Sequence, residues 1–439
     1  MAGVVAGRAR WAVLALCAAQ FVLIVDVVIV TVALPSIRRD LVIPDARLSL
    51  VGVAYTVTFG SLLIVLGRVG DVLGRRAVLL AGMVVFTLAS AAAAAAQRDW
   101  HLFAARAAQG VGAAMVSANA LASINARFAE GPARNRALGL WAAVGSAGAV
   151  AGQLIGGAVT ELFGWRWIFL INLPIGLLVV AVLARTLPES RAERRGRIDV
   201  AGSALLAGGT ALLVGALAAA ADGTGVGPVV GLLVGAAAVL SVFALVERGR
   251  AEPVLRLGLL RLPGVRTANA TLFLNAGALG AALFFTTLYL QVVLGYSALA
   301  VSAVFAPVTV AILVLSPRAA ALTGRFGVRT LLAGGLTLLA AGALLLARVP
   351  VEGGLVDVLP SLALFALGSS MSYAPTFVAA SSGVPDTEQG AAAGLINSTQ
   401  ELGSAVCLAL LAWGGGGGPP RPPGAAQNPP PPPAVAPAP

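Results

Sequence analysis

Two charged residues lie inside stretches of sequence that are otherwise almost entirely apolar. Asp26 is midway along the apolar run 11–34, and Arg106 is about one helical turn inside the run 102–124. A carboxylate buried in lipid costs a few kcal/mol when charged, so Asp26 is expected to face the interior of a helix bundle and to hold its proton. A carboxylate that exchanges its proton with water on each side of a membrane in turn is what proton coupling requires. Arg106 needs a buried partner or a water-filled cavity.

Each of these residues has a simpler interpretation. Asp26 would then only hydrogen-bond a neighbouring helix, and Arg106 would extend its side chain toward the outer surface. Three further polar residues, Gln109, Gln153 and Glu401, are candidates for the lining of a cavity, and Glu401 is a candidate second titratable or cation-binding site.

A short charged segment, GRVGDVLGRR at 67–76, separates two runs of spanning length. Its Gly and Arg content predicts a tight cytoplasmic turn between two helices. Within it, Asp71 is suited to accept hydrogen bonds from the amides of a helix N-terminus, and Arg75 and Arg76 are suited to reach carboxylates or helix C-termini. We therefore predict that the segment acts as a latch at the cytoplasmic surface.

The composition predicts a polytopic membrane protein. The 439 residues are 59% hydrophobic and 11% charged, too few charges for a soluble protein with so much apolar side chain. The net charge of +11 comes entirely from Arg, because no Lys occurs. Without Lys there is no phosphate-binding G-x-x-x-x-G-K-[ST] motif, so an ATP-driven pump is excluded. Cys17 and Cys407 lie in apolar runs, which argues against a disulfide framework, and no metal site or cofactor is expected.

Thirteen apolar runs are long enough to cross a bilayer as helices. They are 11–34, 49–66, 77–96, 102–124, 137–162, 168–187, 200–221, 226–246, 269–294, 298–315, 328–347, 356–380 and 391–413. With the N-terminus inside, the cytoplasmic loops hold roughly three times as many arginines as the outer loops, as the positive-inside rule requires. The basic charge therefore orients the chain in the membrane, and nucleic-acid binding is not expected.

The charged segment recurs in degenerate form at 317–329, between the tenth and eleventh runs, which indicates an internal repeat. We predict an all-α fold of two six-helix bundles, 1–190 and 269–413, separated by an inserted central helix pair at 191–268. Only five helices are recognisable in the second bundle. The repeat predicts a last helix where a Gly- and Pro-rich low-complexity tail, 414–439, stands instead; this tail is interpreted as a truncated or frame-shifted end, or as a genuine disordered tail.

Small residues at three- and four-residue spacing in the fifth run, among them Gly148, Gly152, Gly156 and Gly157, allow close helix packing and predict a hinge between the halves. Generic packing glycines are the alternative interpretation.

Several of these strings resemble motifs of the major facilitator superfamily, in particular its drug:proton antiporters with fourteen helices. The spacing of Gly67, Asp71, Gly74, Arg75 and Arg76 resembles the loop between the second and third helices of that superfamily. The segment 102–114 is similar to its R-x-x-Q-G-x-G-A-A motif, and GWRWIFLINLPIG at 164–176 is similar to the start of the sixth helix in the antiporter branch.

Two other segments resemble motifs of the same superfamily but differ from them at one or two positions. The segment 26–35 resembles D-x-T-I-V-N-V-A-L-P, with Val28 and Thr31 in place of Thr and Asn. The segment 148–157 resembles the exporter motif G-x-x-x-G-P-x-x-G-G, with Gln153 in place of Pro, which weakens the export assignment.

The resemblance implies the major facilitator fold and a secondary transporter, not an enzyme, that exports amphipathic drugs or antibiotics in exchange for protons. It also implies that Asp26 and Arg106 act in proton coupling and that the segment 67–76 acts as a cytoplasmic gate. The expected partners are an amphipathic small molecule, protons and membrane lipids, and a monomer in the cytoplasmic membrane is expected. A channel or a membrane-embedded enzyme fits less well, whereas an exporter of one natural product, or an inactive remnant, remains an alternative.

Overall fold

The computed structural model describes residues 2–189, 199–221, 223–250, 253–350 and 353–414. The predicted tail beyond 414 and the Arg-rich segment 190–198 lie outside these residues. Within them the regular structure is helical throughout, as predicted. The elements are α1 (Ala2–Leu41), α2 (Asp45–Leu48), α3 (Leu50–Leu73), α4 (Arg75–Ala94), α5 (Asp99–Arg127), α6 (Pro132–Phe163), α7 (Arg166–Leu170), α8 (Asn172–Thr186), α9 (Val200–Ala221), α10 (Val226–Arg248), η1 (Leu257–Arg261), α11 (Pro263–Leu288), η2 (Tyr289–Val293), α12 (Ala298–Phe326), α13 (Val328–Leu346), α14 (Leu355–Ser381), η3 (Asp386–Glu388) and α15 (Gln389–Gly414).

The long helices follow from the physics of the bilayer, in which every backbone amide and carbonyl must find its partner within the segment. Among the described residues, 11 helices are long and apolar enough to span a membrane. Each coincides with a predicted run. The remaining two predicted runs, 137–162 and 391–413, fall on the long helices α6 and α15.

The predicted tight turn at 67–76 is wrong in its extent. Helix α3 continues to Leu73 and α4 begins at Arg75, so that Gly74 alone separates them. Gly74 adopts a φ of 113°, a conformation that residues with a side chain rarely adopt. Most of the charged segment is therefore helical, and its side chains are held by helix geometry.

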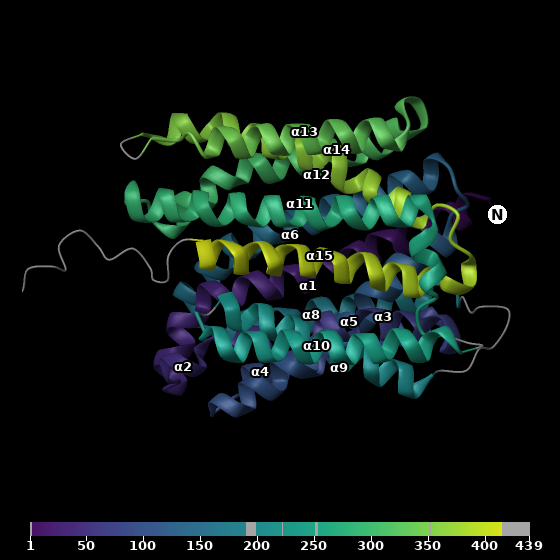
Figure 1. Cartoon of the computed structure of the whole chain (residues 1–439), viewed down its shortest axis with the longest axis horizontal. Helices are drawn as coiled ribbons and strands as arrows, with labels where there is room; N and C mark the ends of the chain where they lie inside the picture. The colour runs from purple at the N-terminus through teal and green to yellow at the C-terminus, as the bar shows by residue number, and fades with distance from the viewer. Residues whose placement is uncertain (1, 190–198, 222, 251–252, 351–352, 415–439) are drawn as a thin grey trace, which may run out of the picture.

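The helices form two groups that meet along α1, α6 and α15. Figure 1 shows α11 to α14 on one side and α3, α4, α5, α9 and α10 on the other. Helix α15 packs against both α11 and α3, and α6 packs against both α1 and α12. The helices α9 and α10 pack against each other, and α9 also contacts α3 and α15.

Glycines of α6 bring it close to α1. A Cβ atom added at Gly152 would lie 2.9 Å from Cβ of Val28, and one added at Gly156 would lie 2.8 Å from Cγ1 of Ile29. Gly148 approaches α1 in the same way, on the other side of Asp26. Small residues at this spacing let two helix backbones come together, and here they seal α6 against the part of α1 that carries Asp26.

Gly157 does not share this contact, because a Cβ atom added at this position would have nothing within 4 Å. The four glycines of the predicted hinge therefore differ: Gly148, Gly152 and Gly156 face α1, and Gly157 faces open space. The hinge itself stays a prediction.

This difference gives a matched pair of substitutions. Gly152→Ala is expected to destabilise the protein by about 1–3 kcal/mol, because the added methyl group overpacks the contact with Val28. Gly157→Ala is expected to be neutral or stabilising by up to about 1 kcal/mol, since Ala favours helix over Gly. The measurement is the apparent melting temperature of each purified variant in detergent, and equal melting temperatures would contradict the packing argument.

Candidate functional site

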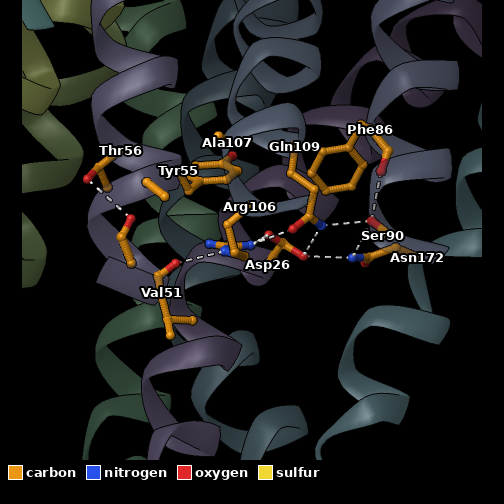
Figure 2. Close-up of polar contacts among 12 residues, drawn as sticks. Asp26, Val51, Tyr55, Thr56, Phe86, Ser90, Arg106, Ala107, Gln109 and Asn172 are labelled. Atoms are coloured by element: carbon orange, nitrogen blue, oxygen red, sulfur yellow. Dashed lines mark hydrogen bonds and ion pairs between the residues drawn. The ribbon is translucent and has the colours of Figure 1, made fainter. Parts of the chain in front are cut away.

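Asp26 and Arg106 meet in the interior of the helix bundle. Arg106 of α5 donates a hydrogen bond from Nη1 to Oδ2 of Asp26 of α1, and the two residues form an ion pair. The side chain of Asp26 has no exposed surface and that of Arg106 is 1% exposed. Figure 2 shows the pair surrounded by polar side chains of neighbouring helices.

Two amide side chains complete the shell around Asp26. Gln109, one turn along α5, donates from Nε2 to Oδ1 of Asp26 at 3.0 Å, and Asn172, at the start of α8, donates to the same oxygen at 2.7 Å. Both amides also donate to Oγ of Ser90 in α4, at 2.8 and 3.3 Å. With Arg106, the carboxylate accepts three hydrogen bonds, and bonds to a charged acceptor are stronger than those between neutral groups.

Arg106 is held from the other side by α3. Its Nε donates to the carbonyl oxygen of Val51 at 3.1 Å, and its guanidinium lies 4.5 Å from the ring centroid of Tyr55. The ring centroid of Phe169 in α7 lies 5.9 Å from the guanidinium carbon of Arg106. Arg106 therefore does not extend to the outer surface, as the alternative interpretation had it, and its contacts with two aromatic rings are stronger where water is excluded.

Two members of this cluster were not singled out in the sequence. Asn172 falls inside the string that resembles the antiporter branch, yet nothing in its spacing indicates that it contacts Asp26. Ser90 lies in an Ala-rich stretch, where a serine is a common small residue. Only the packing of α4 and α8 against α1 and α5 reveals either role.

The segment 67–76 builds a second charged cluster, at the opposite end of α3 from Val51. Asp71 accepts hydrogen bonds from the amides of Gly390 (3.0 Å to each carboxylate oxygen) and Ala391 (3.2 Å), in the first turn of α15. Arg75 donates to Asp71 at 2.7 and 3.0 Å and also to the carbonyl oxygen of Asp386. A carboxylate at a helix N-terminus gains from the helix dipole as well as from these bonds. The cluster, called the latch below, ties α3 to α15.

Neighbouring residues of the segment extend the latch. Arg68 donates to the carbonyl oxygen of Thr387 at 3.3 Å, and Arg76 donates to that of Ala184 in α8 at 2.5 Å. A Cβ atom at Gly67 would collide with the carbonyl group of Gly390. The backbones of α3 and α15 therefore approach each other closely at the latch, which requires Gly.

A cavity of about 240 Å³ lies between the two groups of helices. Its volume is somewhat below the range of roughly 300–1,000 Å³ for pockets that hold drug-sized ligands. Glu401 lines it, as proposed for a cavity residue. Gln109, predicted to line a cavity, is completely buried in the Asp26 cluster instead. Gln153 belongs to α6, but its side chain lies outside the described part of the structure.

No group of three or more His, Cys, Asp or Glu side chains with the geometry of a metal site occurs in the described ranges. The charged groups that the structure brings together are instead ion-paired or hydrogen-bonded to one another and to backbone groups. A bundle of membrane-spanning helices with a central cavity, a buried ion pair beside it and a charged latch at one end defines a transporter.

The comparison with known proteins identifies the family. The profile of the Major Facilitator Superfamily matches residues 16–407, and the chain belongs to this superfamily. The human organic anion transporter MFSD10 (TETRAN) has the same fold, with a TM-score of 0.68 over 92% of this chain and 94% of that chain at 16% identity. The proton:xylose symporter XylE matches with a TM-score of 0.65 over 93% of this chain and 89% of that chain at 14% identity. The predicted family and the major facilitator fold are thus confirmed.

Several curated proteins have higher sequence identity to this chain than these two structures do, and they align with most of its length. It is 39% identical to the puromycin resistance protein pur8 of Streptomyces alboniger, over 92% of this chain and 81% of that protein. It is 37% identical to the cephamycin export protein CmcT of Amycolatopsis lactamdurans, over 90% of this chain and 82% of that protein. The chain is also 31% identical to the multidrug efflux pump LfrA of Mycolicibacterium smegmatis, over 91% of this chain and 80% of that protein.

The latch can be tested by the distance that it holds. Asp71→Asn removes the charge that binds both Arg75 and the first turn of α15, so the end of α3 is expected to separate from α15 and from the connection 382–388 that leads into it. The measurement is the distance distribution between spin labels at the exposed positions Leu73 and Ser382, after both native cysteines are replaced by Ala. Asp71→Asn should broaden it and shift it to longer distances.

The control is Asp99→Asn, which changes an ion pair with Arg47 at the opposite end of the helices. This variant should leave the distribution unchanged. An unchanged distribution in Asp71→Asn would show that the latch contacts do not hold the end of α3 against the start of α15.

Proposed function

We propose that this chain exports amphipathic drugs or antibiotics across the cytoplasmic membrane and draws energy from protons that move inward. Its membership of the superfamily supports transport, and the names of its relatives, which refer to puromycin resistance, cephamycin export and multidrug efflux, support an exported drug or antibiotic. The observation that carries the proton coupling is the position of the Asp26–Arg106 pair relative to the cavity.

Asp26 lies directly behind the cavity wall. Its neighbours in α1, Ile24, Val27 and Val28, line the cavity, whereas Asp26 itself points into the cluster with Arg106. Protonation of Asp26 removes one charge of the pair and weakens its bonds to Arg106, Gln109 and Asn172. Helix α1 then shifts relative to α5 and α8 and changes the shape of the cavity, which links proton binding to release or capture of the substrate.

The latch supplies the gate of this cycle. We place it on the cytoplasmic side, with the N-terminus inside, because the arginine-rich connections gather at that end of the helices. Its closed contacts between α3 and α15 block the cavity from that side. They must break for a substrate to enter from the cytoplasm, as alternating access requires.

The protein acts as a monomer, and its partners are the substrate, protons and surrounding lipids. The proton gradient takes the place of a bound cofactor. A dedicated exporter of one natural product is the second candidate, because the name of the relative CmcT refers to export of a single antibiotic class. A panel of structurally unrelated antibiotics separates the two: one transported compound supports the dedicated exporter and several support the broader function.

The proposed coupling predicts the behaviour of Asp26→Asn. Because Asn keeps the shape of the side chain but cannot ionise, gradient-driven transport should fall at least tenfold. The measurement is uptake of lipophilic cations and antibiotics into inside-out vesicles under an imposed pH gradient. Asp40→Asn is the matched control, since Asp40 is also in α1 and paired with an arginine, Arg166, but at an exposed position.

Transport in Asp40→Asn should stay within about twofold of the original protein. Undiminished gradient-driven uptake by Asp26→Asn would overturn the assignment of Asp26 as the proton carrier. Uptake that falls equally with and without a pH gradient would point to a structural role for Asp26.

A further inference from the structure

The aromatic side chain of Tyr55 connects the central cavity with the buried ion pair. Among the described residues, neither Asp26 nor Arg106 lines the cavity, and their hydrogen-bond partners lie behind its wall as well. Tyr55 of α3 both lines the cavity and places its ring 4.5 Å from the guanidinium carbon of Arg106. Figure 2 shows the ring beside Arg106. No other described side chain with a hydrogen bond, ion pair or ring contact to the pair reaches the cavity.

Contacts between α3 and α5 fix the position of Tyr55 relative to Arg106. A Cβ atom added at Gly110 of α5 would lie 2.5 Å from the carbonyl oxygen of Tyr55, so the two backbones are as close here as a glycine allows. The hydrogen bond from Arg106 to the carbonyl oxygen of Val51 joins the same two helices one turn away. Tyr55 and Arg106 therefore belong to one rigid unit of α3 and α5, whereas Asp26 belongs to α1.

A substrate in the cavity contacts both of these parts. Val27 and Val28 form its wall on the side of α1, and Tyr55 and Phe59, whose rings stack at 5.7 Å, form its wall on the side of α3. A molecule packed between them holds α1 against the unit of α3 and α5, which is the arrangement in which the ion pair exists. It also excludes water from the ring of Tyr55, and the attraction between a ring and a cation such as Arg106 strengthens when water is excluded.

We propose, on the basis of the proton-driven export proposed above, that Tyr55 is the positioning residue through which a bound substrate holds Arg106 against the charged form of Asp26. Coupling between two sites is reciprocal, so protonation of Asp26 weakens substrate binding by the same factor. Substrate affinity is then high while Asp26 is charged, and it falls as the pH drops through the titration of this carboxyl group. Substrate capture expels the proton, and proton binding expels the substrate.

Two other titratable groups face the ring across the cavity, Glu401 of α15 and Tyr373 of α14. The remaining charged pairs of α3 and α5, in the latch and between Arg47 and Asp99, lie at the two ends of these helices. Titration of the groups in the cavity also changes binding with pH. The variant Asp26→Asn measures that share, because its residue 26 cannot ionise.

The test measures how strongly pH changes the binding of two probes. Ethidium is a permanent cation and chloramphenicol is neutral, and neither gains or loses a proton near neutral pH. The equilibrium dissociation constant of each probe for the full chain in lipid nanodiscs is measured by equilibrium dialysis from about pH 5 to about pH 9, where buried carboxyl groups titrate. The original protein is expected to bind at least one probe, and to bind it at least about fivefold more weakly at the acidic end, as is typical of coupled sites.

Three substitutions in α3 separate the ring from the rest of the wall. Tyr55→Leu keeps an apolar wall but removes the ring, so the pH effect should fall to that of Asp26→Asn. Tyr55→Phe keeps a ring of similar affinity for cations and should keep the pH effect to within about twofold. Phe59→Leu is the matched control, because Phe59 lines the cavity one turn away without a described contact to Arg106. It should weaken binding equally at every pH.

Tyr55→Met provides the same test if Tyr55→Leu does not yield a monodisperse protein. A variant without the ring that keeps the full pH effect of the original protein would overturn the proposal. Loss of the effect in Tyr55→Phe would assign it to the hydroxyl group instead, and an equal loss in Phe59→Leu would assign it to the cavity wall in general; either result also overturns the proposal.

Failure of the proposed function gives a different pattern. Binding of neither probe to the original protein would contradict the export of such compounds, and a pH effect that persists in full in Asp26→Asn would contradict the assignment of Asp26 as the proton carrier. Each of these results removes the role of Tyr55 together with the function on which it rests. A pH effect that is lost in Asp26→Asn but kept in Tyr55→Leu overturns only the role of Tyr55.

Discussion

The ion pair between Asp26 and Arg106 constrains the positions of the helices around it. Removing two charges from water costs several kcal/mol for each ion, and only good geometry with further hydrogen bonds offsets that cost. Here the bonds and ring contacts come from α1, α3, α4, α5, α7 and α8. These helices must therefore hold their mutual positions for the pair to exist. The glycines of α6, which bring that helix against α1 beside Asp26, belong to the same arrangement.

The two membrane-embedded acids differ in how completely they are satisfied. Asp26 is surrounded by donors and has no contact with the cavity, whereas Glu401 faces the cavity with no partner among the described side chains. They also lie on different helices, α1 and α15, of the seam along which the two groups of helices meet. In the proposed cycle the wall residues of α1, Ile24, Val27 and Val28, link Asp26 to the cavity.

Much of the architecture could be predicted from the sequence because lipid imposes a simple rule on apolar runs. Every predicted run falls on helical structure, and the sequence singled out both members of the ion pair, Asp26 and Arg106, although not their contact. Side-chain partners could not be predicted in the same way. Ser90 and Asn172 have no diagnostic spacing, Gln109 is bonded to Asp26 instead of lining the cavity, and the bond between Asp71 and α15 joins residues more than 300 positions apart. Such details arise from contacts between segments far apart in the sequence.

The latch recognises the main chain of its partner. Asp71 binds amide groups of Gly390 and Ala391, and Arg68 and Arg75 bind carbonyl oxygens of Thr387 and Asp386. Because every residue type except proline carries both of these groups, the chemical identity of the α15 side chains is free to vary while their size is not. At these latch contacts the segment 386–391 can therefore change side chains and still close on α3. A gate of this kind tolerates evolutionary drift on one side without a compensating change on the other.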